Sequence, residues 1–269
     1  MAELKRFEFS ALRLDHRDDG QLALLTLNRP NARNAISRGM AGDLREACEA
    51  LASMESGAVR VVILTGAGEA FSAGADLVER RGLQPDGRSE HTAEIEAAAE
   101  ALANLPVPTV AAVHGFALGG GAELALACDL RVAGTDAVFG FPEVRIGVFP
   151  GAGGVRRLPP LVGVGAARDL LYTGRRIDAE EAARIGLVDR VVGPEMVVEA
   201  SLVLARQIAE NAPLAVRAVK RALHVVEEAG QGATREWVNE LRRSLDRTAD
   251  CEEGLAAFAE KRTPRFTGR

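Results

Sequence analysis

Cysteine is scarce in this chain of 269 residues, and the positions of its cysteines argue against both disulfide bonds and a zinc site. Cys48, Cys128 and Cys251 are odd in number, far apart and never arranged as a CxxC pair. Neither a disulfide framework nor a zinc site is therefore expected, and no metal ligand is assigned. Free thiols persist in a reducing compartment, so the sequence predicts a cytoplasmic protein.

The chain also lacks long apolar runs and an excess of positive charge. No stretch is long and apolar enough to span a bilayer, and the N-terminal residues mix acids with bases, unlike a secretory signal. The formal net charge is -5, and lysine occurs only at Lys5, Lys220 and Lys261. Nucleic acids and anionic membranes bind surfaces with a surplus of basic side chains, so neither partner is expected.

The first half of the chain alternates short β-like runs with helical patterns. Strands are predicted at 22–28, 59–66, from 109 onward, at 129–134 and at 137–141, and helices at 39–54 and 93–105. The polar stretch 79–92 contains Gly and Pro and is predicted to be a loop, whose mobility would suit a substrate entrance.

From residue 154 onward the pattern becomes almost entirely helical. Helices are predicted at 163–172, 178–185, 194–210, 213–229, 233–247 and 250–260, with one strand at 187–193. Trp237 lies in this part, where packing or an interface explains it better than chemistry. An α/β first part followed by helices indicates an N-terminal core with a C-terminal helical appendage.

Two segments of small residues follow predicted strands, FSAGADL at 71–77 and ALGGGAEL at 117–124. Glycine and alanine let a ligand approach the backbone, and a helix that opens at GGG presents unpaired N–H groups at its positive end. Each segment could bind an anion or a polarised oxygen, or could be only a tight turn. A nucleotide site is disfavoured, because neither a P-loop nor a complete GxGxxG motif is present.

A serine hydrolase is a sharper alternative. HGFALGGG is similar to the His-Gly oxyanion segments of esterases, and Ser72 lies between small residues. However, Ala70 stands where the nucleophile elbow GxSxG requires glycine. His91 falls in the predicted polar loop, neither His16 nor His224 has a triad-like setting, and His114 ends an apolar strand as a hydrogen-bonded core histidine would.

Two glutamates are better placed for acid–base chemistry. Glu123 lies one turn inside the helix that GGG opens, in a run that is otherwise apolar. Glu143, in FGFPEV, follows Pro142 and has apolar neighbours that favour its protonated form. Two carboxyl groups in apolar settings can serve as one general acid and one general base.

Several long motifs together resemble the enoyl-CoA hydratase/isomerase, or crotonase, family over essentially the whole chain. They are NRPNARNAI, FSAGADL, PTVAAVHGFALGGGAELALACD, FGFPEVRIGVFPGAGG and FAEKRTPRF, in the family's order. The resemblance implies an α/β fold, a spiral of repeated β-β-α units with a C-terminal helical trimerisation region. It divides the chain into a core with the acyl-CoA site at 1–195 and an oligomerisation region at 196–269, and it implies a homotrimer or a homohexamer built as a dimer of trimers.

The resemblance also implies residue roles. Backbone N–H groups of Ala75 and Gly120 would form an oxyanion hole for the thioester oxygen of an acyl-CoA substrate. Hydratases of the family carry two glutamates, matched here by Glu123 and Glu143. Glu123 would deprotonate the attacking water, Glu143 would deliver a proton to Cα, and the N–H of Gly151 would help to position the water.

The implied reaction is the reversible syn addition of water to a 2-enoyl-CoA, giving a 3-hydroxyacyl-CoA, as in β-oxidation of fatty acids. No cofactor is expected, since coenzyme A is part of the substrate. The residues that match the family's CoA-contacting positions are Arg29, Asn31, Ala32, Arg33, Ala73, Ala75, Asp76, Leu77, Val78, Phe258 and Lys261, the last two acting in a neighbouring subunit. Many relatives have lysine where this chain has Asn31 and Val78, so Arg29, Arg33 or Arg80 would replace those phosphate contacts.

Several alternatives stay open at this stage. A double-bond isomerase of the same family needs only one glutamate, and a catalytically idle scaffold would need neither. The wording around LANLPVPTVAAVHG is closest to the methylglutaconyl-CoA hydratase branch, some members of which also bind AU-rich RNA, although the acidic balance disfavours an RNA-binding role here. The α/β-hydrolase interpretation requires a reactive serine.

Overall fold

Two β-sheets organise the protein, and the computed structural model describes residues 9–54, 58–229 and 231–269. The larger sheet has the order β1-β2-β3-β4-β6-β9, with β1 antiparallel to β2 and the other neighbours parallel. Its strands are β1 (Leu12–Arg17), β2 (Leu22–Leu27), β3 (Val61–Gly66), β4 (Thr109–Val113), β6 (Leu130–Gly134) and β9 (Arg190–Val192). The smaller sheet has the order β5-β7-β8, from β5 (Phe116–Leu118), β7 (Val138–Gly140) and β8 (Arg176–Asp178).

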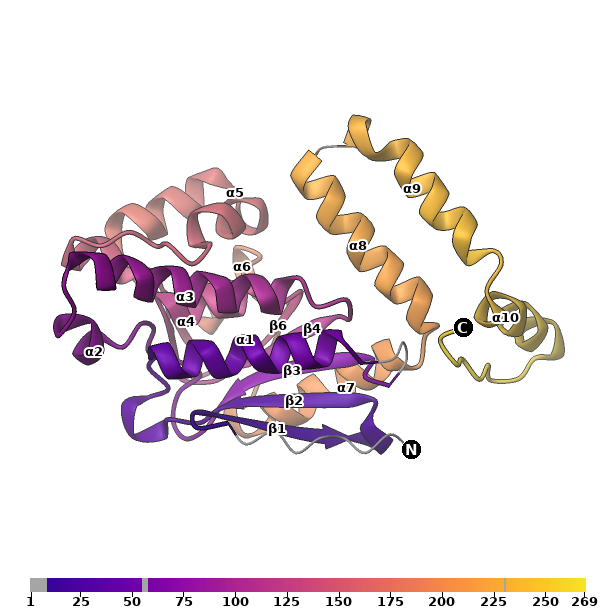
Figure 1. Ribbon diagram of the computed structural model, residues 1–269, viewed down its shortest axis with the longest axis horizontal. Coiled ribbons are helices and arrows are strands. Elements are labelled where there is room, and N and C mark those ends of the chain that lie inside the picture. The colour runs from indigo at the N-terminus through magenta and orange to yellow at the C-terminus, as the bar shows by residue number, and fades with distance from the viewer. Residues whose placement is uncertain (1–8, 55–57, 230) are drawn as a thin grey trace.

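Helices cover both faces of the larger sheet. In Figure 1, α1 and α3 lie over one face and α7 lies against the other. The helices are α1 (Arg38–Ala52), α2 (Leu77–Arg81), α3 (Pro85–Ala103), α4 (Gly120–Ala127), α5 (Gly154–Thr173), α6 (Ala179–Arg184), α7 (Val197–Ala209), α8 (Pro213–Ala229), α9 (Gln231–Leu245) and α10 (Ala249–Glu260). Short 3-10 turns are η1 (Asp18–Gly20), η2 (Pro30–Ala32), η3 (Pro142–Ile146) and η4 (Pro194–Met196).

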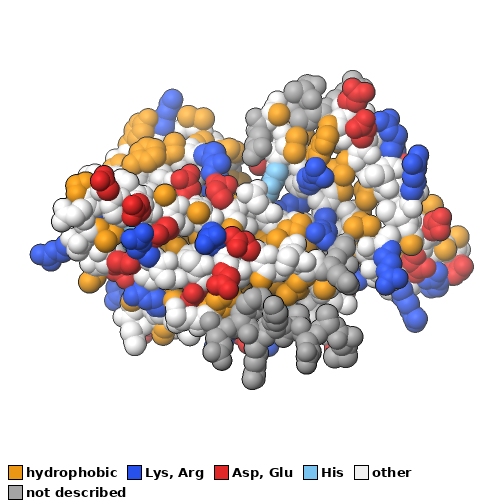
Figure 2. Space-filling view, in the orientation of Figure 1, with side chains coloured by type: hydrophobic (Ala, Val, Ile, Leu, Met, Phe, Trp, Pro, Cys, Tyr) orange, Lys and Arg blue, Asp and Glu red, His pale blue; other side chains and the backbone are white. Residues whose placement is uncertain are grey.

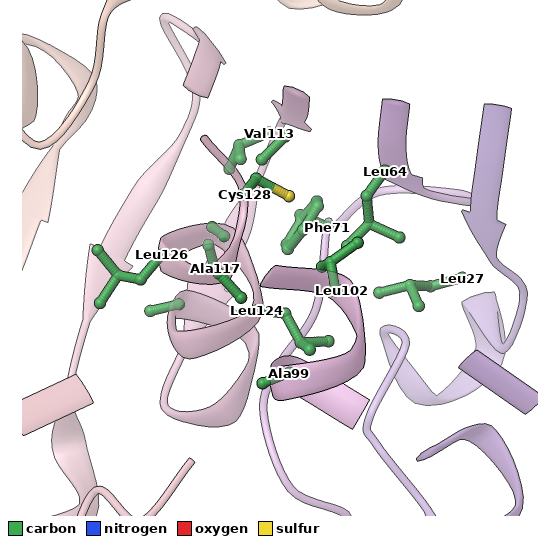
Figure 3. Close-up of a cluster of buried hydrophobic side chains, with 14 of the residues drawn as sticks. Leu27, Leu64, Phe71, Ala99, Leu102, Val113, Ala117, Leu124, Leu126 and Cys128 are labelled. Atoms are coloured by element: carbon green, nitrogen blue, oxygen red, sulfur yellow. The ribbon is translucent and has the colours of Figure 1, made fainter. Parts of the chain in front are cut away.

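Alternate residues of the central strands serve two separate cores. Every residue of β2 and β3 is buried, as expected of parallel strands covered on both faces. Leu25 and Leu64 face α1 and α3, whereas Leu24 and Ile63 face α7. Figure 3 shows Leu124 of α4 beside Leu102 and Ala99 of α3, so the helix that carries Glu123 is packed into the first core.

The chain winds as the resemblance implies, and the α/β class and the β-β-α spiral are confirmed. β4 joins the larger sheet, β5 the smaller sheet, and α4 follows; β6 joins the larger sheet, β7 the smaller one, and α5 follows after η3. Isolated bridges pair Ser72 with Ala117 and Ile36 with Ala75. The bridge from Ser72 to Ala117 brings the two small-residue segments, 71–77 and 117–124, together near the start of α4.

The predicted loop at 79–92 is wrong, because these residues form most of α2 and the first part of α3. Pro85 occupies the first turn of α3, where a missing N–H costs nothing, so it starts the helix instead of preventing it. The buried face of α3 begins at His91 and continues through Ile95, Ala98, Ala99 and Leu102. His91 is consequently fully buried instead of lying in a polar loop.

Other boundaries also differ from the sequence prediction. The helix expected at 163–172 begins at Gly154, and it includes Pro159 and Pro160 and a break at Gly163, where φ is +77°. Strands β1, β5 and β8 were absent from the prediction. Two of them have only three residues, too few for a periodic pattern, and β1 mixes charges with leucine.

The C-terminal helices α8, α9 and α10 stand to one side of the sheets (Figure 1). α8 is fastened by the buried Lys220, whose Nζ lies 2.9 Å from the carbonyl oxygen of Val107 and 2.8 Å from Oδ2 of Asp129. The guanidinium of Arg221 lies 5.1 Å from the ring centre of Trp237, which accords with a packing role for the tryptophan. The division of the chain at residue 195 stays a prediction.

Two surface properties complete the fold. Within residues 9–54, 58–229 and 231–269, no helix combines the length and apolarity that a bilayer crossing requires. Figure 2 shows acidic and basic side chains mixed over the α1 and α3 face. Arg38 of α1 and Glu94 of α3 form one such pair, with Nη2 of Arg38 2.7 Å from Oε1 of Glu94.

Candidate active site

The first candidate donor is the backbone N–H of Ala75, which a short bridge leaves unpaired. Ile36 donates its N–H to the carbonyl oxygen of Gly74 at 2.8 Å, and Asp76 donates to that of Ile36 at 3.0 Å. These bonds form the isolated bridge between Ile36 and Ala75 and occupy the groups on either side of Ala75, but not its own N–H. Among the described residues, no hydrogen bond uses that N–H.

The second donor is the N–H of Gly120, where α4 begins. Gly119 precedes it with φ of +51° and donates its own N–H to the carbonyl oxygen of Gly140 at 2.9 Å. Gly120 lies in the first turn of α4, and no acceptor for its N–H lies within the described part of the chain. A Cβ built on Gly120 would stand 3.5 Å from the nitrogen of Ala75, so the two donors are close neighbours.

Glu123 extends from the first turn of α4 into the loop before α5. Its side chain is buried, and its Oε1 accepts hydrogen bonds from the N–H groups of Ala152 at 2.9 Å and Gly154 at 2.8 Å. Burial raises the pKa of Glu123, while these two hydrogen bonds and the positive charge of Arg157 act in the opposite direction. These backbone N–H groups therefore stabilise the ionised form of Glu123, which burial alone would disfavour.

Glu143, in η3, has the more perturbed carboxyl group. Both of its carboxyl oxygens are buried and have no hydrogen-bond partner among the described residues. Burial raises the pKa of Glu143 to about 7, and the nearby charge of Glu123 adds to the shift. The charge of one carboxyl group therefore affects the pKa of the other, and both the protonated and the ionised forms of Glu143 are populated near pH 7.

Arg157 holds the loop that binds Glu123. Its Nη1 donates to the carbonyl oxygen of Ala152 at 3.1 Å, and its Nη2 donates to Glu100 of α3 at 2.7 Å. Arg156 also pairs with Glu100, but its side chain is mostly exposed and donates no hydrogen bond to the loop among the described residues. No sequence signal marks Arg157, because nothing in the spacing ties an arginine of α5 to a carboxylate of α4.

The residues predicted to contact CoA on the first two segments lie beside the donors. Arg29 donates to Asp76 at 2.9 Å and to the carbonyl oxygen of Ala35, and Asp76 also caps the start of α2. Ala73 is tied to Arg33 through its N–H at 2.9 Å. The exposed members of the set are Asn31, Arg33, Leu77 and Val78, and the half-buried ones are Arg29, Ala32, Ala73 and Ala75.

Three further predicted residues have different surroundings. Arg80 donates to the hydroxyl of Thr92 at 2.9 Å, which ties α2 to α3. Phe258 is 88% exposed and Lys261 is also exposed, both near the end of α10, on the opposite side of the molecule from α2 (Figure 1). Within one chain, the fold does not bring these two residues to the donors.

Gly151 and Ser72 occupy contrasting environments. Gly151 is half-buried in the loop before α5, and a Cβ there would stand 2.7 Å from Cγ2 of Thr92. Ser72 is fully buried, and its hydroxyl donates to the carbonyl oxygen of Asn34 at 2.8 Å. His114 contacts the carbonyl oxygen of Gly68 at 3.1 Å. A nucleophilic role for Ser72 is not supported, because its hydroxyl is committed to the backbone.

Known proteins resemble this chain in sequence and in fold. The family model described as enoyl-CoA hydratase/isomerase matches residues 17–269. The Bacillus subtilis protein YngF, named as an enoyl-CoA hydratase/isomerase, is 44% identical over 92% of this chain and 95% of its own length. A Pyricularia oryzae mitochondrial methylglutaconyl-CoA hydratase is 36% identical over 94% of this chain and 84% of its own. The crystal structure of an enoyl-CoA hydratase from Bacillus anthracis superposes with a TM-score of 0.93 at 40% identity, over 96% of this chain and 100% of that one.

Proposed function

Because the chain belongs to the enoyl-CoA hydratase/isomerase family, we propose that it is an enoyl-CoA hydratase. It adds water, reversibly and with syn geometry, to the double bond of a 2-enoyl-CoA and produces a 3-hydroxyacyl-CoA. The observation that supports hydration best is the placement of two carboxyl groups with raised pKa values beside two unpaired backbone donors. One carboxyl group would suffice for moving a double bond, whereas adding water requires a proton acceptor and a proton donor.

The donors stabilise the charge that develops as water attacks Cβ. Electrons of the double bond move toward the thioester carbonyl, whose oxygen becomes an enolate oxygen. The N–H groups of Ala75 and Gly120 hold that oxygen, and a donor of this kind is typically worth about 3 kcal/mol in the transition state. Because both groups are fixed by backbone bonding, little reorganisation is needed when the charge appears.

The two glutamates divide the proton transfers. Glu123 acts as the base: its Oε1 is held by two N–H groups, and no hydrogen bond among the described residues uses Oε2, which remains for the water. The N–H of Gly151 helps to position that water. Glu143, with a pKa of about 7, donates its proton to Cα. The proton gained by Glu123 then returns to Glu143 through solvent, which completes the cycle.

The proposed reaction uses no cofactor, because adding water changes no oxidation state overall and coenzyme A belongs to the substrate. Dialysis against a chelator should therefore leave the hydration rate unchanged. The three cysteines are free, which fits a reducing compartment and supports a cytoplasmic location.

The direct test is the conversion of crotonyl-CoA, followed by the loss of absorbance of the conjugated thioester and by detection of the 3-hydroxy product. A 3-enoyl-CoA, assayed in parallel, tests double-bond isomerisation. Isomerisation of the 3-enoyl-CoA without hydration of crotonyl-CoA would contradict the proposal. A panel of short, branched, aromatic and long 2-enoyl-CoA substrates, with 3-methylglutaconyl-CoA included, would define the acyl group.

We also propose a homotrimer, or a homohexamer built from two trimers. Phe258 and Lys261 are exposed and lie far from the donors of their own chain, which supports a role in a neighbouring CoA site. Light scattering gives the mass of the assembly. A stable monomer with full activity would contradict this part of the proposal.

A further inference from the structure

His91 is a buried polar side chain that the proposed mechanism does not use. It lies on α3 with no exposed surface, and its Nδ1 has no hydrogen-bond partner among the described residues. Its Nε2 lies 3.0 Å from the carbonyl oxygen of Ile36. A carbonyl oxygen only accepts, so Nε2 carries a hydrogen in this contact, and Nδ1 is left without a partner.

The contact between His91 and Ile36 lies on the isolated bridge between Ile36 and Ala75, which orients the N–H of Ala75. The carbonyl oxygen of Ile36 also accepts the N–H of Asp76, at 3.0 Å, so its two acceptor positions are filled by Asp76 and His91. Ile36 is also the residue that pairs with Ala75 in the isolated bridge. His91 therefore fastens α3 to the one backbone segment that turns the N–H of Ala75 toward Gly120.

The helix face that carries His91 also reaches the second donor. Ile95 follows His91 by one helical turn and lies on the same face of α3. A Cβ on Gly120 would stand 3.6 Å from Cγ2 of Ile95 and 3.4 Å from Cδ1 of Ile36. One face of α3 thus holds the Ala75 segment by a hydrogen bond and packs directly against Gly120.

The unpartnered Nδ1 distinguishes this histidine from ordinary packing. A buried polar nitrogen without a partner destabilises the folded state, and a phenylalanine of similar size would avoid that penalty. The hydrogen bond from Nε2 is the one feature of the side chain that phenylalanine lacks and that benefits the site. Glu79, whose Oε2 lies 4.0 Å from Nε2, is itself held by the N–H of Arg38 and keeps the start of α1 in the same cluster.

We infer that His91 is a positioning residue of the oxyanion hole, which sets the direction of the Ala75 N–H through the carbonyl group of Ile36. This inference rests on the proposed function of the same site. His91 touches neither the substrate nor the reacting atoms in this role. Its loss should weaken transition-state stabilisation while leaving substrate binding and folding largely intact.

Three substitutions separate positioning from packing. His91→Phe keeps the volume and removes the donor; we expect kcat for crotonyl-CoA to fall about 10- to 100-fold, with KM little changed and Tm unchanged or higher. His91→Gln places an amide N–H near the position of Nε2 and should recover most of kcat. His91→Asn is too short to reach Ile36 and should not.

Thr26→Val is the matched control, because Thr26 on β2 is another buried residue whose polar atom, Oγ1, has no partner. This change should leave kcat unchanged. A second readout uses cinnamoyl-CoA, whose absorption moves to longer wavelength when its carbonyl oxygen accepts stronger hydrogen bonds. The shift should be smaller on His91→Phe than on the wild type and on His91→Gln.

A wild-type kcat in His91→Phe would overturn the inference, and so would a loss of kcat that follows a loss of Tm and is not recovered by glutamine. The spectral shift keeps this test independent of turnover. If the wild-type protein fails to hydrate any enoyl-CoA but the shift depends on His91 as described, the proposed function fails and the positioning role of His91 stands.

Discussion

Gly119 and Glu143 fit against each other with no room for a side chain between them. A Cβ placed on Gly119 would stand 3.0 Å from Oε1 of Glu143. The same glycine has φ of +51° and precedes the donor at Gly120. One residue thus controls both the approach of the proton donor and the start of the helix that stabilises the oxyanion.

Replacing Gly119 by alanine should therefore damage activity more than folding. The substitution strains a left-handed backbone, by about 1–3 kcal/mol, and displaces the carboxyl group of Glu143. We expect crotonyl-CoA hydration to fall by at least about tenfold, consistent with the share of general acid catalysis. Gly42→Ala in α1 is the control, since a Cβ there meets nothing within 4 Å and should raise stability slightly. Equal activity in both variants would disprove the constraint.

Glu123→Gln and Glu143→Gln each remove one proton-transfer group while preserving shape. Each variant should lower kcat for crotonyl-CoA by about 100- to 10,000-fold. Circular dichroism should be unchanged, and a non-reactive acyl-CoA should bind with similar affinity. Unchanged turnover in either variant would remove that glutamate from the mechanism.

Hydration should decline as pH rises above about 7. Glu143 must carry a proton to protonate Cα, and its pKa of about 7 means that this proton is lost in that range. The raised pKa of Glu123 limits the acid side, because the base must be ionised. The pH profile of kcat/KM should therefore be bell-shaped. Addition and removal of water should show the same pH profile of kcat/KM, because both directions use the state in which Glu123 and Glu143 together hold one proton. A flat profile from pH 6 to 9 would contradict the roles of these two glutamates as base and acid.

Glu143→Gln should also stabilise the protein at alkaline pH. The folded pKa of Glu143 lies above its ordinary value of 4.5, so the folded state holds the proton more tightly than the unfolded chain. Stability is consequently lost as pH rises from about 4.5 to 7, and this penalty is complete above 7. Thermal unfolding should show a higher Tm for the variant than for the wild type at pH 8, by an amount equivalent to about 1–3 kcal/mol, with little difference at pH 4.5. If Glu143→Gln were less stable than the wild type at pH 8, the ionised carboxylate of Glu143 would have to be stabilised in the folded state, which would contradict this prediction.

Arg157→Gln should move the acid limb of the activity profile to higher pH. The positive charge of Arg157 lowers the pKa of Glu123, so removing it lets burial raise that pKa further. The variant also loses the contact with Ala152, so kcat should fall. Arg156→Gln is the adjacent control, since the side chain of Arg156 pairs with Glu100 but donates no hydrogen bond to the loop among the described residues. Identical pH profiles for the two variants would exclude the electrostatic role.

The sequence predicted the central strands well because most of their residues are apolar and buried. β3, predicted at 59–66 and observed at Val61–Gly66, is one example. It does not predict β5 or β8, since three residues show no period. Pro85 is typical of a loop by its residue type alone, yet it starts a helix. Local patterns record which residues are apolar, but a short strand exists only because a distant partner is present.

Glu123 could be singled out from the sequence because a carboxyl group in an apolar run needs an explanation. The hydrogen bonds that Glu123 accepts from the N–H groups of Ala152 and Gly154 could not be predicted, because a backbone donor does not depend on the residue type. His91 could have been found from the spacing to Ile95 and Leu102, which repeats at one and three helical turns. The glycine and proline before it masked that signal.

The burial of Lys220 has a consequence for chemical labelling. Of the three lysines, Lys5 lies outside the described residues, and Lys220 is enclosed between Val107 and Asp129. Lys261 is therefore the one exposed lysine amine in the described part of the chain. An amine-specific fluorophore, used where the α-amino group is blocked, would report from near the end of α10, so changes in its emission on adding ligand would test whether this end of the chain lies at the proposed boundary between subunits.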